Sequence, residues 1–477
     1  MTGSTVARVA IYPRSVKGRF RNLKWGILGL AYGVYFLLPW LRWDRGQGPS
    51  QAVLFDIPGR RFYLFDLVVY AQDIFWLAGL LIIAALLLFF VTGILGRVFC
   101  GYFCFQTLWT DVFLFVERFV QGERPARIRL AKAPWSVGKA AKLSLTHLLW
   151  LLIAMATAAT FVLYWGDAPS LLVAMVTGEA PSAAYVTVFF LTATTYVMAG
   201  WAREQVCTYM CPYARFQSVM FDSDTRIVGY DTGRGEGKAG RAKLAPGLKT
   251  REERHAKGVG DCVDCGYCVQ VCPTGIDIRN GLQIECISCA LCIDACNNIM
   301  DHAGFPRGLI GYTSEKEQSG APVRVLKPKT YGYGLALLVA VGALTWSVAA
   351  REPFELSVTQ IRQPLAVTLS DGRVQNNYEL KLTNKTNETA RYAIGITGLQ
   401  GAELEIGRFE TVSLEPGRSV TLVAHVRVDP DEARQAQQDF KFVVEPVDGG
   451  DGRGEPRTWR SVFYIPSLER AEVSLVH

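Results

Sequence analysis

Two cysteine runs constrain this chain more than any other feature of its sequence. The runs span Cys262–Cys272 and Cys286–Cys296, and both have the spacing CxxCxxCxxxC. Three thiolates at this spacing wrap one iron–sulfur cluster, while the fourth lies too far along the chain to close the same cube and crosses to the other cluster. We therefore predict two [4Fe–4S] clusters, one held by Cys262, Cys265, Cys268 and Cys296 and the other by Cys272, Cys286, Cys289 and Cys292.

Zinc is the main alternative metal for thiols of this kind. It usually takes its four ligands as two separated pairs, and the doubled run departs from that pattern. The segment resembles bacterial two-cluster ferredoxins, although Asn297 follows Cys296 where ferredoxins usually have proline. This difference predicts altered hydrogen bonding near the sulfur, and so an altered potential, without loss of a ligand.

Four further cysteines form two CxxxC pairs upstream of the runs. They are Cys100 with Cys104, and Cys207 with Cys211, so that all 12 cysteines lie between Cys100 and Cys296. A disulfide framework would scatter them through an exported domain. The clustering indicates metal ligation in a reducing compartment.

Long apolar segments indicate a membrane protein. Half of the 477 residues are hydrophobic, and a helix needs about 20 mostly apolar residues to cross a bilayer. The short apolar segment Leu171–Thr177 is expected at the interface. We predict five spans: Trp25–Leu41, Ile74–Leu95, Leu143–Trp165, Tyr185–Trp201 and Tyr331–Ala350.

The charged loops predict how these spans are oriented. The residues before Trp25 are strongly basic, the loop Arg97–Lys142 carries eight Lys or Arg, and Gly166–Ala184 carries none. Cytoplasmic loops are enriched in Lys and Arg. We expect a multi-pass protein of the bacterial inner membrane, with the N-terminus and the ferredoxin-type domain in the cytoplasm and the C-terminus in the periplasm. The basic residues therefore indicate membrane topology, not nucleic-acid binding.

The two extramembrane parts downstream differ in character. Asp231–Gly258 is rich in Gly, Lys and Arg, and we expect a flexible linker there. After Arg351 the net charge turns negative, with 15 Lys or Arg against 19 Asp or Glu. Short alternating segments between turn signals predict an immunoglobulin-like β-sandwich. Its expected strands are Leu365–Ser370, Tyr378–Thr383, Arg391–Thr397, Ser419–Val428, Phe440–Val447 and Trp459–Ile465.

The CxxxC pairs are candidate copper ligands. Spacing of four residues places two thiols on one helix face, and both pairs fall at the predicted cytoplasmic end of a span. Thiolate sulfur favours copper(I) and zinc over hard cations. Buried structural cysteine remains the alternative. Pro212 predicts that the second helix bends or ends there. Haem at His147 is disfavoured because no second intramembrane histidine exists, and Asp73 is expected to be interfacial.

The whole chain resembles the CcoG/FixG/RdxA family of cytochrome oxidase accessory proteins. The resemblance rests on Arg97-Val-Phe-Cys-Gly-Tyr-Phe-Cys104, on Arg203-Glu-Gln-Val-Cys-Thr-Tyr-Met-Cys-Pro-Tyr-Ala-Arg-Phe-Gln217, on the two runs, and on the order of spans, ferredoxin and immunoglobulin-like tail. Phe105 stands where the family has proline, which leaves the shape of the first helix end open.

The resemblance implies a role in the maturation of cbb3-type cytochrome c oxidase. Members of this family look like cupric reductases, so this chain is expected to be an oxidoreductase that converts Cu(II) to Cu(I). Copper ions, the oxidase and its copper-delivery factors would be its partners, together with an unidentified electron donor. Two alternatives stay open: an electron-transfer module for another enzyme, as in NosR/NapH proteins, or a non-redox copper chaperone or scaffold.

These expectations give a multi-domain membrane protein with an α-helical bundle of about five spans. The expected order is a basic N-terminus (1–24), a four-span region with both CxxxC pairs (25–211), a linker and two-cluster ferredoxin-type domain (212–330), a fifth span (331–350) and an immunoglobulin-like domain (351–477).

Overall fold

The chain separates into two units. The computed structural model describes residues 11–45, 48–324, 327–386, 388–407, 411–429, 436–447 and 456–465. The first unit comprises Met1–Arg42, Gln51–Gly59 and Phe75–Leu344, and the second comprises Trp43–Ser50, Arg60–Ile74 and Thr345–His477. The membrane-length helices and the cysteine runs thus belong to the first unit, and the tail belongs to the second.

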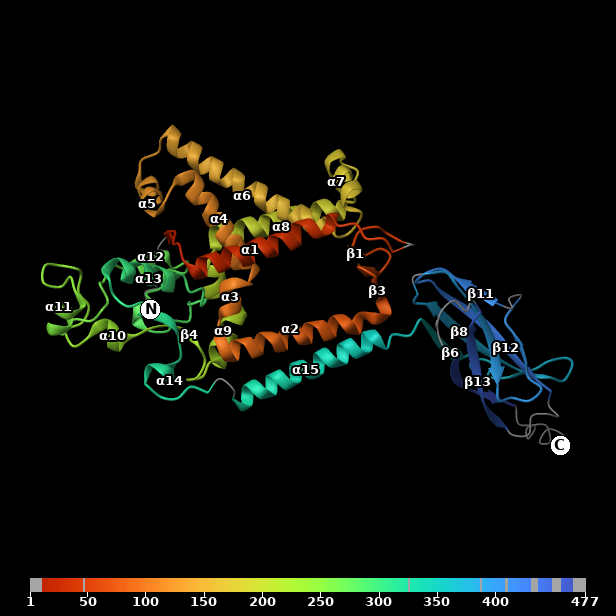
Figure 1. Cartoon of the computed structure of the whole chain (residues 1–477). Helices are drawn as coiled ribbons and strands as arrows, with labels where there is room; N and C mark the ends of the chain where they lie inside the picture. Colours follow the sequence, from red (N-terminus) through yellow and green to blue (C-terminus); the bar gives the residue numbers. More distant parts are fainter. Residues whose placement is uncertain are drawn as a thin grey trace, which may run out of the picture. The chain divides into compact units, whose positions relative to one another are not determined.

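Helices form most of the first unit, and a short strand, β1 (Val53–Asp56), follows the first of them. α2 and α15 lie side by side, since Gly79 faces Leu344 and Gly334 faces Phe90 (Figure 1). The helices up to the second CxxxC pair, with α15, are α1 (Arg19–Leu37), α2 (Ile74–Leu95), α3 (Val98–Tyr102), α4 (Phe105–Gln121), α5 (Arg124–Lys132), α6 (Val137–Leu163), α7 (Ala168–Thr177), α8 (Ser182–Thr195) and α15 (Pro328–Ala349).

Five helical segments in the described part of the chain are long and apolar enough to cross a membrane. Four of them, α2, α6, α8 with its π-helical continuation, and α15, correspond to predicted spans. The fifth is Val98–Gln121, in a region that we expected to be a loop. The predicted span Trp25–Leu41 corresponds to α1, which is not among the five. α7 is a shorter apolar helix, as predicted for the Leu171–Thr177 region.

A buried ion network joins α1 to α4 and explains why the sequence pattern was misleading here. Asp111 of α4 lies 3.2 Å from the guanidinium of Arg21 and 2.9 Å from the ammonium of Lys24. Lys24 is 1% exposed, and removing one partner of such a buried pair costs about 3–5 kcal/mol. In the sequence, the charged residues Arg21, Lys24 and Asp111 look as if they belong to loops. In the structure they neutralise one another between α1 and α4.

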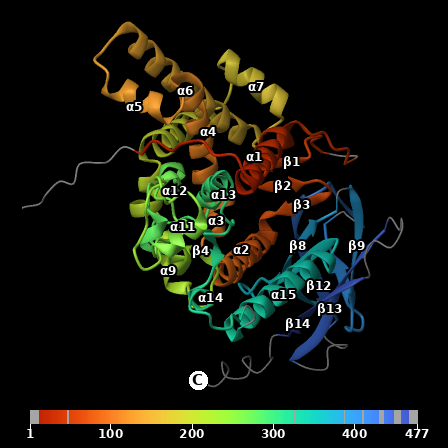
Figure 2. The same cartoon turned by 60° about the vertical axis from the view of Figure 1, so that its left-hand side comes forward.

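The iron–sulfur segment is built on two short helices that carry the later cysteines of the two runs, Cys268 on α12 (Tyr267–Val271) and both Cys292 and Cys296 on α13 (Leu291–Ala303). α12 and α13 pack together, and a two-stranded sheet of β4 (Ile227–Tyr230) and β5 (Ile310–Thr313) lies next to them. Figure 2 shows α12 and α13 beside α3 and α9 (Pro212–Met220). Their apolar core includes Val228, Ile278, Ile293 and Met300.

The Asp231–Gly258 segment is not the flexible linker that we predicted. It folds into α10 (Thr232–Glu236) and α11 (Arg251–Ala256), followed downstream by the short helix α14 (Glu315–Gln318). The Arg254 guanidinium is fully buried and donates hydrogen bonds to the carbonyls of Ala242, Gly260 and Cys262 at 2.8–2.9 Å. One arginine thus organises the segment around the first cysteine run, an effect that composition does not reveal.

Three helix ends meet the iron–sulfur segment. The Asp294 carboxylate of α13 accepts hydrogen bonds from the backbone N–H groups of Phe20 and Arg21 at the start of α1, at 3.3 and 2.8 Å. The Arg226 N–H donates to the Ile94 carbonyl at the end of α2 at 2.9 Å. Lys327, just before α15, pairs with Asp222. The start of α1, the end of α2 and the start of α15 therefore lie at one end of the bundle.

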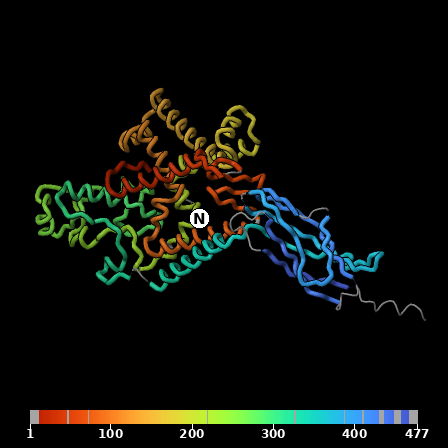
Figure 3. The backbone as a smooth tube through the Cα atoms, turned by 45° about the vertical axis from the view of Figure 1, so that its right-hand side comes forward, coloured from red at the N-terminus to blue at the C-terminus, as the bar shows by residue number. Residues whose placement is uncertain are grey.

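The tail is a β-sandwich, as predicted. One sheet has the order β10-β12-β8-β6, with β7 on β8, and the other has the order β11-β9-β13-β14. Both sheets belong to the part of the chain that Figure 3 draws in light to dark blue. Tyr378, Phe442 and Phe463 fill the space between the sheets. The strands are β6 (Phe354–Gln360), β7 (Val367–Thr368), β8 (Val374–Asn384), β9 (Ala390–Thr397), β10 (Glu403–Glu405), β11 (Thr411–Leu414), β12 (Ser419–Val428), β13 (Gln437–Pro446) and β14 (Arg457–Tyr464).

A hairpin from the first extramembrane loop belongs to the same unit as the sandwich. It consists of β2 (Arg61–Leu64) and β3 (Leu67–Tyr70). Asp73, which follows the hairpin, is buried and lies 2.8 Å from Arg351 and 3.8 Å from Lys385. These ion pairs give Asp73 a structural role where the two chain segments meet.

Candidate iron–sulfur and thiol sites

The two cysteine runs fold into loops with matching backbone conformations. Asp264 and Ser288, each just before the second cysteine of its run, have φ values of 47° and 52°. Gly266 and Ala290, each just after that cysteine, have φ values of 65° and 61° and cap α12 and α13. Left-handed backbone is unfavourable for non-glycine residues. Its repetition at equivalent positions indicates two sites built on one plan.

The structure brings the thiols of the second predicted set together. Cys272, Cys286, Cys289 and Cys292 line one small cavity, with Cys268 at its edge. Ile276, Ile278 and Ile287 complete the wall. Burial raises the pKa of the Cys286 thiol to about 12 and also raises that of Cys289. Soft sulfur donors in an apolar shell of this kind fit a cluster, which takes four thiolates.

The first predicted set is also assembled, nearer the surface. Burial raises the pKa of Cys296 to about 12, and the neighbouring thiols Cys268, Cys262 and Cys265 raise it further. Arg279 stands beside Cys268 and pairs with Asp264 at 2.6 Å. Asn297, the departure from the ferredoxin pattern, accepts a hydrogen bond from the Gly308 N–H at 3.1 Å. The four thiols therefore fit a second cluster.

The two CxxxC pairs share a backbone geometry that differs from our expectation. Each first cysteine lies in a short helical turn, α3 for Cys100 and the π-helix Val206–Met210 for Cys207. Each second cysteine, Cys104 or Cys211, is extended and caps the following helix, α4 or α9. The prediction of two thiols on one continuous helix face is therefore wrong, because the helix ends between them.

The same unusual hydrogen bond closes both turns. The Cys104 N–H donates to the Phe99 carbonyl at 3.0 Å, and the Cys211 N–H donates to the Val206 carbonyl at 2.8 Å. The preceding helix ends at Met210, two residues before Pro212, in line with the predicted bend or end there, and Pro212 is the first residue of α9. Phe105 occupies the equivalent position of α4. Proline is therefore unnecessary for this geometry.

The four membrane thiols are neighbours. Burial raises the pKa of Cys207 to about 12, and the other three thiols, Cys104, Cys100 and Cys211, each raise it further. Nevertheless, no three His, Cys, Asp or Glu side chains in the described residues converge on a single ion position.

A polar shell around the first thiol pair was missed by the sequence analysis. The Cys100 thiol donates to the Gln217 side-chain oxygen at 3.2 Å, and the Arg97 Nε donates to the same oxygen at 3.3 Å. The Gln217 amide donates to Tyr213 at 2.8 Å and to Thr92 at 3.1 Å. Gln217 is fully buried, so it fixes the orientation of Cys100 from a helix that is distant in sequence.

The first thiol pair touches the loop of the second cysteine run. A Cβ atom on Gly101 would lie 2.7 Å from the Ile287 carbonyl oxygen and 2.9 Å from the Cys289 Cα. The Tyr102 hydroxyl donates to the Cys289 carbonyl at 3.2 Å. Cys100 shares an apolar core with Ile287 and Cys289. The segment that carries Cys100 is therefore in direct contact with the second cysteine run.

His147 has a structural environment, as the sequence indicated. Its Nδ1 lies 2.9 Å from the Tyr196 hydroxyl, and its ring stacks on Trp201 with a centroid distance of 5.7 Å. Trp150 meets the same ring edge-on. The contacts satisfy the histidine within the bundle.

Comparison with known proteins supplies two domain families and three relatives of nearly full length. Residues 202–315 match a 4Fe-4S dicluster domain, and residues 344–466 match the IG-like fold at the C-terminus of FixG. Protein RdxB of Cereibacter sphaeroides is 47% identical and covers 93% of this chain and 94% of its own. Nitrogen fixation protein FixG of Rhizobium meliloti is 41% identical, with 92% and 90% covered. Protein RdxA of Cereibacter sphaeroides is 42% identical, with 93% and 95% covered.

Proposed function

This chain belongs to the FixG/RdxA family of membrane iron–sulfur proteins, and from that premise we propose that it reduces Cu(II) to Cu(I) at its four membrane thiols. The observation that carries the proposal is the contact between Gly101 and the Ile287–Cys289 backbone. It joins the thiols that suit copper to a loop that suits an iron–sulfur cluster, so that an electron has a short path between them.

The cysteines have separate roles in this proposal. Cys262, Cys265, Cys268 and Cys296 would hold one [4Fe–4S] cluster, and Cys272, Cys286, Cys289 and Cys292 would hold the other. When bound, these groups supply single electrons. The apolar walls around Cys286 and Cys289 exclude water, and the Arg279–Asp264 pair secures the loop of the first run.

Copper would be captured by Cys100, Cys104, Cys207 and Cys211. Each Cu(II) ion takes one electron and becomes Cu(I), with no other bond broken. Thiolate binds the soft product ion better than the harder substrate ion, and such differential binding favours reduction. Gln217 and Arg97 hold Cys100 in place through the contacts described above.

The membrane orientation is part of the proposal. The start of α1, the end of α2 and the start of α15 meet the iron–sulfur segment. The basic loops favour the cytoplasm for this end, and the sandwich then lies in the periplasm. The family resemblance suggests cbb3-type cytochrome c oxidase and its copper-delivery factors as partners.

Anaerobic metal analysis with a Cu(II) reduction assay tests the function. We expect about eight iron and eight acid-labile sulfide atoms per chain, as two four-iron clusters require. Cys207→Ser with Cys211→Ser should keep the iron, lose copper affinity and slow Cu(II) reduction, and cells should assemble less active oxidase. Cys265→Ser should lose iron first while keeping Cu(I) binding.

The same assay separates the competing functions. If the protein is a non-redox chaperone, each variant should bind copper in proportion to the membrane thiols that it keeps, and the wild type should not reduce Cu(II). An electron-transfer module for another enzyme predicts reducible clusters and unchanged copper behaviour in the Cys207→Ser/Cys211→Ser variant. Stoichiometric zinc without iron would contradict the cluster assignment altogether.

A further inference from the structure

Cys265 distinguishes itself from the other cysteines by its exposure. It is exposed, whereas the other 11 are buried or half-buried. It belongs to the first cysteine set, while Gly101, next to Cys100, contacts the loop of the second set. The first set therefore reaches the surface at Cys265, and the second set reaches the first CxxxC pair at Gly101.

A cavity of about 590 Å³ opens beside Cys265. Its walls are the strap Arg14–Lys17, the α4–α5 turn at Glu123 and Pro125, and the side chains of Tyr267 and His302. The Arg14 N–H donates to the Gln270 carbonyl at 2.8 Å, and the Tyr267 hydroxyl donates to the Ser15 carbonyl at 2.9 Å. The strap is thus hydrogen-bonded along the rim of the cavity.

The charge around this cavity is one-sided. The strap and α5 carry five cations outside the buried network, namely Arg14, Lys17, Arg124, Arg129 and Lys132, against the single acid Glu123. The Arg14 guanidinium lies 4.7 Å above the Tyr267 ring, which directs it over the rim. By contrast, residues 202–324 carry 15 basic and 15 acidic residues. Of these charges, Arg14, Lys17 and Glu123 line the cavity, so its wall carries an excess of positive charge that the domain as a whole does not have.

We propose that this surface, the Cys265 face, defined by Arg14, Lys17, Cys265, Tyr267 and His302, docks an acidic one-electron carrier protein that supplies the reducing electrons. The inference rests on the proposed function. Electron-transfer complexes are small and transient, and opposite charge speeds their encounter by about 10- to 1,000-fold. One electron leaves the reduced carrier and arrives at the site of Cys262, Cys265, Cys268 and Cys296, with no proton or leaving group transferred.

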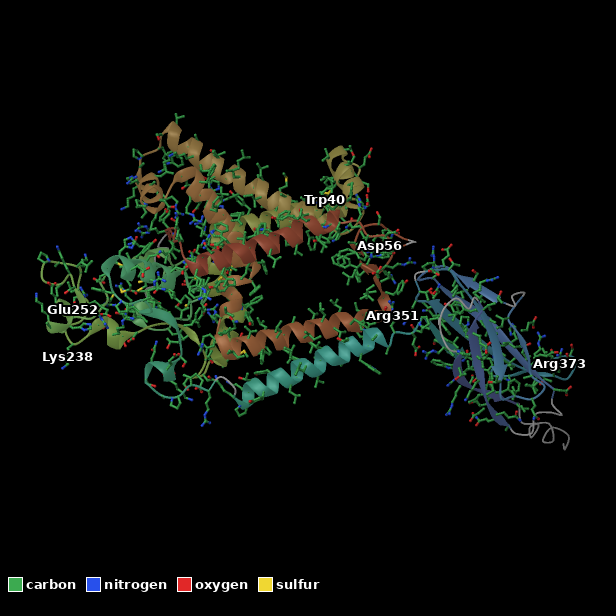
Figure 4. The ribbon with its side chains drawn as sticks, in the orientation of Figure 1. Trp40, Asp56, Lys238, Glu252, Arg351 and Arg373 are labelled. Atoms are coloured by element: carbon green, nitrogen blue, oxygen red, sulfur yellow. The ribbon has the colours of Figure 1, made fainter. Side chains whose placement is uncertain are left out.

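The test uses the full-length, iron-loaded protein in detergent with a reduced bacterial flavodoxin as the probe. The variant is Arg14→Glu with Lys17→Glu, and the matched control is Lys238→Glu with Lys243→Glu, two exposed lysines of the same domain. Lys238 is labelled in Figure 4. The single variant Lys17→Glu is a second test in case the double variant disturbs the fold of the strap. The hydrogen bond from the Asn298 side chain, at 2.8 Å, is accepted by the Lys17 backbone carbonyl, so a change of the side chain does not remove it.

We expect flavodoxin oxidation at low salt to slow about tenfold in the strap variant, in line with steered association, and to stay near wild type in the control. Binding of oxidised flavodoxin should weaken in parallel, and added salt should reduce the wild-type rate toward that of the variant.

Three outcomes would overturn the inference. Equal rates in wild type and strap variants would show that these cations do not steer the carrier. Equal slowing in the control variant would show that the carrier is not steered to the Cys265 face. An effect that appears only in vesicles with anionic lipid, and not in detergent, would assign the cations to the membrane surface. Protein that has been reduced with dithionite to the same end point and then desalted separates all three from failure of the proposed function, in which this reduced protein also fails to reduce Cu(II).

Discussion

Gly101 shows how much can depend on one missing side chain. Its Cα lies against the backbone of Ile287 and Cys289, and any Cβ would fall within 3 Å of both. Sequence reasoning identified the cysteines on either side of it from their spacing, because ligand spacing is a local property. It could not assign the contacts of Gly101 or Gln217, although both stand within the family motifs, since their partners are more than 100 residues away.

Gly101→Ala should weaken the contact between the thiols and the cluster loop. Forcing an added methyl into a packed contact typically costs about 1–3 kcal/mol, so we expect a lower midpoint of thermal unfolding and slower Cu(II) reduction at unchanged iron content. Gly93→Ala in α2 is the matched control, because nothing lies within 4 Å of its Cβ position. Identical copper kinetics in both variants would show that this contact is not on the electron path.

The helices and strands show which sequence patterns predict secondary structure and which do not. α2 and α15 were predicted almost to the residue, since long apolar runs need no tertiary partner to be recognised. α4 was missed because Asp111 and Glu117 interrupt its apolar pattern, and each is neutralised by cations from other elements. The β-sandwich was predicted from strand alternation, although β6, β10 and β11 were not.

The start of α1 depends on a cap supplied by α13. Asp294 is 5% exposed and accepts from two N–H groups of the first turn of α1. Because loss of a capping side chain costs about 0.5–2 kcal/mol, Asp294→Ala should lower the midpoint of thermal unfolding in detergent. Asp301→Ala, on the same helix, removes a surface pair with Arg307 and should change stability much less than Asp294→Ala does, because solvent screens an exposed pair. Equal effects would argue against the cap.

At the scale of the whole molecule, the proposed function requires the iron–sulfur segment and the β-sandwich to lie on opposite sides of the membrane. Reporter fusions at Gly240 and at Asp448 should therefore report the cytoplasm and the periplasm, respectively, as the basic loops predict. Asp448 lies outside the described residues and serves only as a position in the tail. The same compartment at both positions would contradict either the fifth span or the orientation.

The central claim is that electrons held at the cysteine runs pass to copper at the membrane thiols. It is tested most directly by mixing anaerobic, dithionite-reduced and desalted protein with Cu(II) and recording cluster oxidation and Cu(I) formation in the same sample. We predict one Cu(I) for each electron lost, with both signals slowed together in Cys100→Ser/Cys104→Ser at unchanged iron content. Cu(I) formation at the wild-type rate in that variant would contradict the claim.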